Sequence, residues 1–154
     1  MRMIFILFSS CLLLVSCSDE RSSQPEKSNR NRVEKVERNF TQVQIKRGRQ
    51  LFLKNCTVCH GINGEGSPDW QKRLPDGSYP PPPLNGTGHA WHHPKKVLVD
   101  TIKHGTARLG GKMPAWKDKL SEQDINAIIA WFQSQWPDEL YQAWQRMDQA
   151  KSNN

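Results

Sequence analysis

Four stretches of the chain repeat apolar residues at the three- and four-residue spacing of amphipathic helices. They cover about residues 41–55, residues 94–104, residues 121–132 and the segment that follows Pro137. The third stretch is the clearest, because Ser121 and Asp124 form a capping signal just before its apolar positions. These positions are Ile125, Ile128, Ile129 and Phe132. No alternation of strands with helices is visible, so the sequence predicts an all-α fold.

A long segment between the first two helices has a different composition. From Gly61 to Pro94 it is rich in glycine and proline, and Pro80 to Pro83 are consecutive. These residues oppose regular structure. A loop of this length is unusual inside a compact domain unless it wraps around another object. The sequence therefore predicts helices joined by one long Pro/Gly-rich loop.

The first residues have the pattern of an export signal. Arg2 precedes an almost wholly apolar run from Met3 to Val15, which has the length of a signal-peptide core and is short for a bilayer span. The run ends in Leu14-Val15-Ser16-Cys17, which resembles a bacterial lipobox. We expect residues 1–16 to be a lipoprotein signal peptide that is cleaved before a lipidated Cys17. Ordinary secretory cleavage and an uncleaved anchor are the alternatives.

A polar segment follows the signal. Residues 17–39 are rich in Ser, Gln, Asn and charged side chains and contain no aromatic residue. We expect a flexible tether from the lipid at Cys17, or alternatively an extension of the first helix. Residues 40–150 then form one domain with a modest core. The protein is expected on the periplasmic side of a bacterial membrane, and Ser18 favours the outer membrane by analogy with other lipoproteins.

The charge of the chain favours acidic partners. It has 22 Lys and Arg against 15 Asp and Glu, and loss of the signal removes only Arg2. Such an excess suits acidic proteins or an anionic membrane surface. Seven basic residues lie between Lys95 and Lys119, where they form either a docking face or an ordinary solvated surface. No nucleic-acid-binding motif accompanies them, so nucleic acid is not an expected partner.

The motif Cys56-Thr57-Val58-Cys59-His60 has the most specific chemistry. Two thiols three positions apart, followed by an imidazole, are typical of covalent attachment of one c-type haem. Each sulfur forms a thioether and His60 ligates the iron. The alternatives are a zinc site and a thioredoxin-like redox motif. Zinc needs about four ligands, and the other two cysteines, Cys11 and Cys17, lie in the export segment.

Beyond this motif, the chain resembles a class I monohaem cytochrome c over about residues 43–136. The match includes Gly48-x-x-Leu51-Phe52 before the motif and the run from Ile128 to Phe132 in the third predicted helix. The resemblance implies a cytochrome c fold, in which helices wrap around one covalently attached haem. It also implies that the first and last core helices cross closely at Gly48, near Ile128 and Trp131.

The resemblance implies a methionine as the sixth iron ligand. Met113, in Gly110-Gly111-Lys112-Met113-Pro114, matches the family pattern around that ligand. A thioether stabilises ferrous iron and raises the reduction potential. Met113 could instead fill a gap in the core. Met147 is the competing candidate, although its place in a helical stripe suits packing better.

A second loop motif resembles the family's Pro-x-Leu-x-Gly sequence. It is Pro82-Pro83-Leu84-Asn85-Gly86. The resemblance implies that the carbonyl of Pro82 accepts a hydrogen bond from His60 and thereby orients the ligand. The alternative for these residues is a rigid polyproline linker.

Three histidines form a dense group outside the haem motif. His89, His92 and His93 could bind copper or zinc, because imidazole suits both metals. They could also pack against the haem or its propionates. His104 is expected at a helix end, where an imidazole interacts favourably with the helix dipole.

Together these features predict a membrane-tethered c-type cytochrome that carries single electrons between redox partners. With both axial positions filled, no substrate reaches the metal, so we expect no enzyme activity. One alternative is a haem-containing oxidoreductase or peroxidase-like enzyme, which would need an open sixth position and distal acid–base groups. The other is a haem or metal sensing module.

Overall fold

The computed structural model describes residues 36–152, and this part of the chain contains helices and no strand. In chain order the elements are α1 (Gln42–Asn55), α2 (Thr57–His60), η1 (Ala90–His92), α3 (Lys95–His104), η2 (Ala107–Leu109), α4 (Glu122–Gln133) and α5 (Asp138–Ser152). The predicted all-α fold is therefore confirmed. The signal segment, Cys17 and most of the expected tether lie outside the described residues. Within those residues, no helix is long and apolar enough to cross a membrane.

The helix ends follow the capping signals of the sequence. Thr41 precedes α1, and its hydroxyl accepts a hydrogen bond from the backbone N–H of Gln44 at 3.2 Å, in a reciprocal capping box. Ser121 precedes α4, and its hydroxyl accepts from the N–H of Asp124 at 3.1 Å. Each side chain satisfies a donor that the first helical turn leaves free. Local chemistry thus decides where these helices begin.

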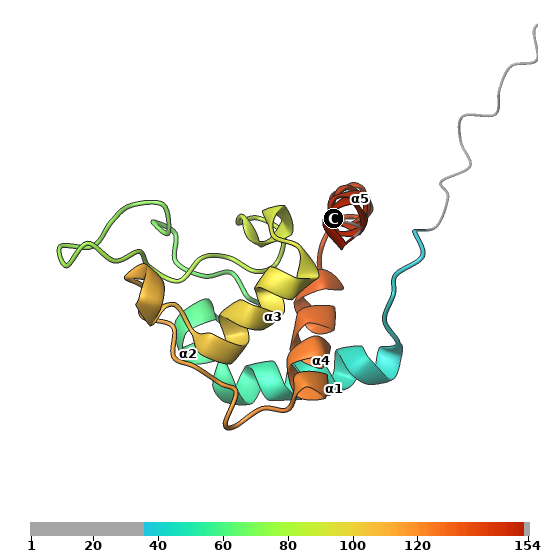
Figure 1. Ribbon diagram of the computed structural model, residues 1–154, viewed down its shortest axis with the longest axis horizontal. Coiled ribbons are helices and arrows are strands. Elements are labelled where there is room, and N and C mark those ends of the chain that lie inside the picture. Colours follow the sequence, from blue (N-terminus) through green and yellow to red (C-terminus); the bar gives the residue numbers. More distant parts are fainter. Residues whose placement is uncertain (1–35, 153–154) are drawn as a thin grey trace, which may run out of the picture. The chain divides into compact units, whose positions relative to one another are not determined.

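Helices α1 and α4, which are far apart in the sequence, cross in direct contact (Figure 1). Phe52 of α1 is fully buried, and its ring centroid lies 4.2 Å from that of Trp131 in α4. The apolar stripe predicted for α4 is buried throughout. It consists of Ile125, Ile128, Ile129 and Phe132. This pair of helices forms the base from which the loops extend.

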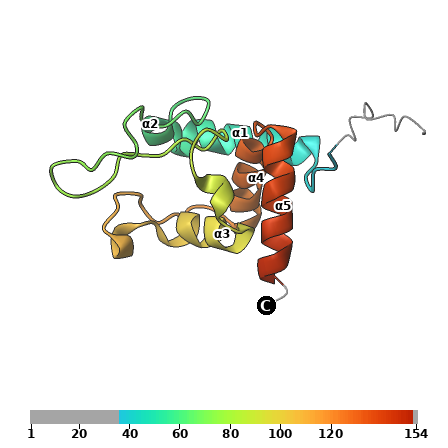
Figure 2. The same cartoon turned by 90° about the horizontal axis from the view of Figure 1, so that it is seen from above.

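Aromatic side chains of the last helix, α5, and of the turn before it complete the core. Trp136, Tyr141 and Trp144 are all buried and pack against one another at centroid distances of 5.5 to 6.0 Å. The indole N–H of Trp136 donates to the carbonyl of Leu84 at 2.8 Å, and that of Trp144 donates to His93 at 2.9 Å. Figure 2 shows α5 beside α4, with α3 nearby. These bonds attach the long loop to the helical core.

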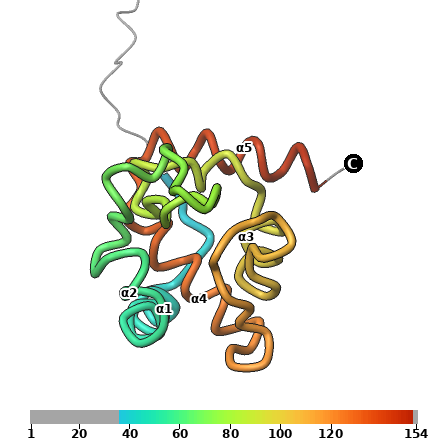
Figure 3. Tube along the Cα trace, turned by 90° about the vertical axis from the view of Figure 1, so that its left-hand side faces the viewer, coloured from blue at the N-terminus to red at the C-terminus, as the bar shows by residue number. Residues whose placement is uncertain are grey.

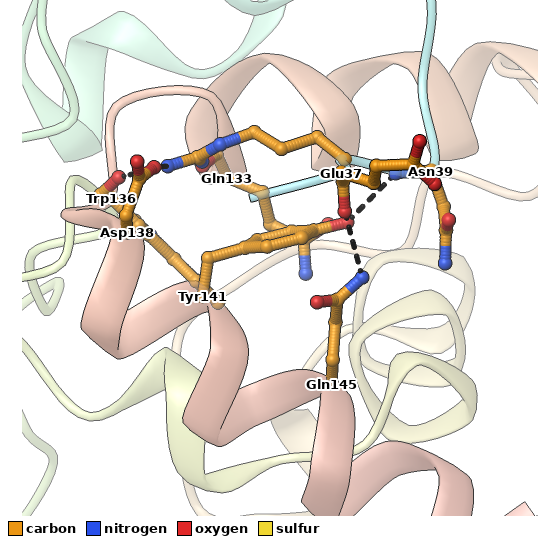
Figure 4. Close-up of polar contacts among 8 residues, drawn as sticks. Glu37, Asn39, Gln133, Trp136, Asp138, Tyr141 and Gln145 are labelled. Atoms are coloured by element: carbon orange, nitrogen blue, oxygen red, sulfur yellow. Dashed lines mark hydrogen bonds and ion pairs between the residues drawn. The ribbon is translucent and has the colours of Figure 1, made fainter. Parts of the chain in front are cut away.

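The packed structure begins earlier than residue 40. Arg38 donates to the carbonyls of Gln133 and Trp136, both at 2.7 Å, and pairs with Asp138 at 2.5 Å. Its guanidinium also lies 4.6 Å above the ring of Tyr141. Figure 4 shows these groups gathered where α4 turns into α5, together with bonds from Asn39 and Gln145. Arg38 and Asn39, at the end of the expected tether over residues 17–39, thus bind to the helical domain.

Candidate functional site

The three residues of the attachment motif lie on one turn of helix. Cys56 ends α1, and the short helix α2 follows at once, with the N–H of His60 donating to the carbonyl of Cys56 at 2.9 Å. Helical spacing places Cys56, Cys59 and His60 on neighbouring faces of this turn. Both cysteines are free thiols; Cys56 is half-buried and Cys59 is exposed. Both sulfurs are thus available to one flat ligand lying over the turn.

The electrostatics of Cys56 oppose a role in thiol redox chemistry. Burial, and to a smaller extent the neighbouring Cys59, raises the pKa of the Cys56 thiol to about 11. Redox-active cysteines instead have a lowered pKa, because the thiolate is the reactive form. The thioredoxin-like alternative is therefore disfavoured.

The imidazole of His60 is held in one orientation. It is buried, with 8% of its surface exposed, and its Nδ1 lies 3.0 Å from the carbonyl oxygen of Pro82. A carbonyl only accepts, so Nδ1 carries the proton and Nε2 keeps a free lone pair. Burial lowers the pKa of His60, although the bond to Pro82 acts in the opposite direction. A neutral imidazole with a fixed tautomer and a free Nε2 is the state in which histidine binds a metal.

Glycines allow the long loop to approach this turn. Gly66 lies so close to the proline run that a Cβ atom at this position would come within 2.4 Å of the nitrogen of Pro83. Its N–H donates to the carbonyl of His60 at 2.8 Å, and the N–H of Leu84 donates to Gly64 at 2.7 Å. Gly66 also has a positive φ of 63°. The loop thus brings Pro82 to His60 through close backbone contacts.

Met113 lies in the loop between η2 and α4 and is half-buried. Its N–H donates to the hydroxyl of Thr106 at 3.0 Å, and its carbonyl accepts from the N–H of Thr106 at 3.0 Å. Gly105 makes this contact possible, since a Cβ atom there would lie 2.4 Å from the carbonyl oxygen of Met113. Met147, the competing methionine, packs against the hydrophobic core from α5. In Figure 3 the long loop and the segment from α3 to α4 lie to either side of α4.

The histidine group is organised by ring stacking. His89 stacks on Trp70 with centroids 5.0 Å apart, His93 meets His89 edge-on at 5.3 Å, and His92 stacks on Trp91 at 3.6 Å. Burial first, and neighbouring histidines second, lower the pKa of His89 and His93.

These histidines do not form a metal site. Within residues 36–152, no three His, Cys, Asp or Glu side chains gather closely enough to hold a metal ion. The copper or zinc alternative for His89, His92 and His93 is therefore not supported. His104 lies at the end of α3 as expected, where its Nδ1 is 2.7 Å from Asp100.

Several residues around the site were not singled out from the sequence. The hydroxyl of Thr106 accepts a hydrogen bond from the N–H of Met113, and the indole of Trp136 donates to the carbonyl of Leu84. Lys112 forms an ion pair with Asp76 of the long loop. Thr106 has no local motif, although it directly follows the predicted stop of a helix at Gly105. The partners of Trp136 and Lys112 are distant in sequence, so no local pattern could indicate them.

The residues present fit a covalently attached haem. The donor set offers two free thiols on one helical turn and a neutral imidazole whose Nε2 is free. His89 adds a buried Nδ1 that has no hydrogen-bond partner among the described residues, beside an apolar hollow lined by Trp70, Tyr79 and Pro82. Cys56, Cys59 and His60 would hold the group, which supplies one-electron redox chemistry at iron.

This all-helical fold, with a thiol-thiol-imidazole turn and a loop that orients the imidazole, defines a c-type cytochrome domain. The family described as cytochrome c oxidase, cbb3-type, subunit III matches residues 43–132, and the chain belongs to this family. Membership implies covalently bound haem c and a function in electron transfer. The match covers both core helices and the attachment motif.

Individual relatives agree with this assignment. The chain is 37% identical to the cbb3-type cytochrome c oxidase subunit FixP of Azorhizobium caulinodans over 87 residues, which are 56% of this chain and 25% of that protein. It is 32% identical to subunit CcoP of Rhodobacter capsulatus over 101 residues, or 60% of this chain and 30% of that protein. The matched part thus spans about a quarter to a third of these relatives. No solved structure matches the chain significantly.

One expectation is corrected by these relatives. The sequence led us to expect a protein without enzyme activity. That expectation is wrong, because the relatives are subunits of cbb3-type cytochrome c oxidase, which is an enzyme. The physical argument considered only whether substrate reaches this iron, and not whether a c-type cytochrome can be a subunit of an enzyme, as it is in these relatives.

Proposed function

We propose that the protein is a lipid-anchored class I cytochrome c that carries single electrons between redox proteins on the periplasmic side of a bacterial membrane. The observation that carries this proposal is the hydrogen bond of His60 to Pro82, which leaves Nε2 free on the same turn as two free thiols. One haem is attached, through Cys56 and Cys59. His60 and Met113 would hold the iron.

The chain's own residues suit electron transfer. Pro82 fixes the orientation of His60, and Thr106 fixes the backbone at Met113. Side chains held in this way would move little when the charge of a bound iron changes, which would keep reorganisation small. A thioether such as that of Met113 would favour the reduced state.

The proposed partners are redox proteins with acidic surfaces, including a terminal oxidase of the type to which the relatives belong. Basic side chains around the Met113 loop are exposed. They are Arg108, Lys112, Lys117 and Lys119, while Lys95 and Lys96 are exposed at the opposite end of α3. Val58 and Ile62, which flank Cys59 and His60, are 91% and 60% exposed and offer an apolar contact at the attachment motif. Such an arrangement favours rapid, salt-dependent encounter.

For the N-terminal part we propose that residues 1–16 are removed, that Cys17 carries the lipid, and that a tether leads to the domain that ends near residue 150. Ser18 favours sorting to the outer membrane. A Cys17→Ser variant expressed in an exporting host is expected to move from the membrane fraction to the soluble periplasmic fraction. Continued membrane association would contradict the lipid anchor.

Haem attachment is tested on material made in a host that matures c-type cytochromes. The denatured wild-type protein is expected to remain coloured and to exceed its polypeptide and lipid mass by one haem. A Cys56→Ser/Cys59→Ser variant is expected to lose both properties. A colourless wild-type protein of polypeptide mass would overturn the proposal.

Axial ligation is tested by absorption spectroscopy. The ferrous wild-type protein is expected to change little on addition of carbon monoxide, and Met113→Ala is expected to bind it readily and to lose the weak far-red ferric band. Met147→Ala is the matched control and should behave as wild type. Rapid uptake of carbon monoxide by the wild-type protein would instead favour a haem enzyme or a sensor.

A further inference from the structure

An ion pair joins the two loops on which the proposed axial ligands depend. Lys112, the residue before Met113, pairs with Asp76 of the long Pro/Gly-rich loop. The same long loop continues to Pro82, whose carbonyl orients His60. The pair therefore connects the long loop, which orients His60, with the loop that carries Met113.

Asp76 is held in place before it meets Lys112. One oxygen, Oδ1, accepts hydrogen bonds from the N–H and the hydroxyl of Ser78 at 3.0 and 2.6 Å, and Ser78 itself is buried. The turn around it is closed by two backbone bonds, from Leu74 to Ser78 at 2.8 Å and from Gly77 to Leu74 at 2.9 Å. The second oxygen, Oδ2, faces Lys112. Only the lysine must lose conformational freedom when the pair forms, which favours the contact.

The Met113 loop has its other attachment on the opposite side, at Thr106. Thr106 binds the N–H and the carbonyl of Met113 and accepts from the N–H of Gly111 at 2.9 Å. Between these bonds the loop passes through Gly110, which has a φ of 76°, and Gly111. Two glycines make this segment flexible by themselves. The ion pair of Lys112 with Asp76 ties the Met113 loop to the long Pro/Gly-rich loop.

We propose that the Asp76–Lys112 pair is a latch that keeps the Met113 loop closed over the sixth position of the iron. Asp76 and Lys112 are positioning residues that act through Met113. This inference rests on the proposed function, in which Met113 is the sixth ligand. Since both side chains of the pair are largely exposed, salt weakens the latch.

The latch is tested by the binding of imidazole to the ferric holoprotein, because imidazole competes with Met113 for the sixth position. In Asp76→Asn the amide oxygen still accepts from Ser78, but the charge that attracts Lys112 is removed. We expect imidazole affinity to rise about two- to fivefold at low salt, the range for an exposed ion pair. The difference should largely disappear at about 1 M salt.

Further variants make the test specific. Asp69→Asn is the matched control, since Asp69 pairs with Lys72 at 2.8 Å within the same long loop. It should bind imidazole as the wild type does. Lys112→Gln removes the opposite charge and should raise the affinity about as much as Asp76→Asn does, and the double variant Asp76→Asn/Lys112→Gln should raise it no further.

The outcomes separate the latch from the proposed function. If the far-red ferric band is present in the wild type and Asp76→Asn binds imidazole as Asp69→Asn does, the latch is wrong and the ligation stands. If Met113→Ala leaves that band unchanged, Met113 is not the ligand and both proposals fail. A rise in affinity that Asp76→Asn and Lys112→Gln share, that Asp69→Asn lacks and that the double variant does not increase further supports the latch, whereas additive effects of the two substitutions would overturn it.

Discussion

Gly48 of α1 lies directly against the carbonyl oxygen of Ala127 in α4: a Cβ atom at position 48 would be 1.8 Å from that oxygen. The two helices therefore meet backbone to backbone at this crossing. The close approach brings Phe52 onto Trp131 one turn further along. It also sets the position of α2, which follows α1 and carries the attachment motif.

Substitution of Gly48 by alanine is expected to destabilise the holoprotein by about 3 kcal/mol, at the upper end of overpacking effects. An exposed glycine in a helix would instead gain about 1 kcal/mol from the same change. Chemical denaturation followed by helix content measures the effect. Gln50→Ala, at an exposed position of the same helix, serves as control and should change stability by less than about 0.5 kcal/mol. An unchanged or increased stability of Gly48→Ala would contradict the crossing.

Arg38→Lys is expected to destabilise the domain by about 1 to 3 kcal/mol, because the substitution leaves carbonyls at the α4–α5 junction without a donor. A lysine cannot bind the carbonyls of Gln133 and Trp136 together with Asp138, as the planar guanidinium does. Thermal unfolding of the holoprotein measures the loss. Arg49→Lys, on the exposed face of α1, should leave the midpoint nearly unchanged. Equal midpoints for the two variants would show that residue 38 belongs to the tether.

Trp136→Phe is expected to loosen the loop that orients His60. The substitution removes the donor to the carbonyl of Leu84, two residues after Pro82, at a cost of about 1 to 3 kcal/mol. Hydrogen exchange should show faster exchange of the Leu84 amide, which donates to Gly64. Trp144→Phe removes the equivalent bond to His93 and is the matched control. Similar protection of Leu84 in both variants would argue against this role of Trp136.

The ion pair between Arg47 and Asp124 predicts a pH-dependent contribution to stability. Asp124 accepts from Arg47 at 3.0 and 3.2 Å, which, together with Ser121, lowers the pKa of its carboxyl in the folded state. A group whose folded pKa lies below its unfolded value, about 3.9 for Asp, stabilises the fold above that pH. The contribution is lost as the pH falls through the lower, folded pKa.

Asp124→Asn should therefore be less stable than the wild type by about 0.5 kcal/mol at pH 7, and the difference should shrink steadily below about pH 4. Denaturant unfolding of the holoprotein at a series of pH values measures it. Asp118→Asn, at an exposed position before α4, is the control. A difference that stays constant down to pH 2 would mean that the charge of Asp124 is not responsible.

Short-range patterns were sufficient to locate the four longer helices and the chemistry of the attachment motif. Thr41 and Ser121 stand at the starts of α1 and α4 because a capping side chain acts on a donor only three residues away. The spacing of Cys56, Cys59 and His60 likewise has its effect within a single helical turn. The sequence by itself therefore determined the all-α class, the helix starts and the cofactor chemistry.

The tertiary structure decided which distant residues meet. Arg38 looks like part of a polar tether, and only its contact with the turn after α4 makes it part of the domain. The pair of Asp76 and Lys112 and the bond of Trp136 to Leu84 join segments far apart in the chain. Such contacts depend on how the helices cross and how the long loop folds back, which is set by the packing of the whole domain rather than by neighbouring residues.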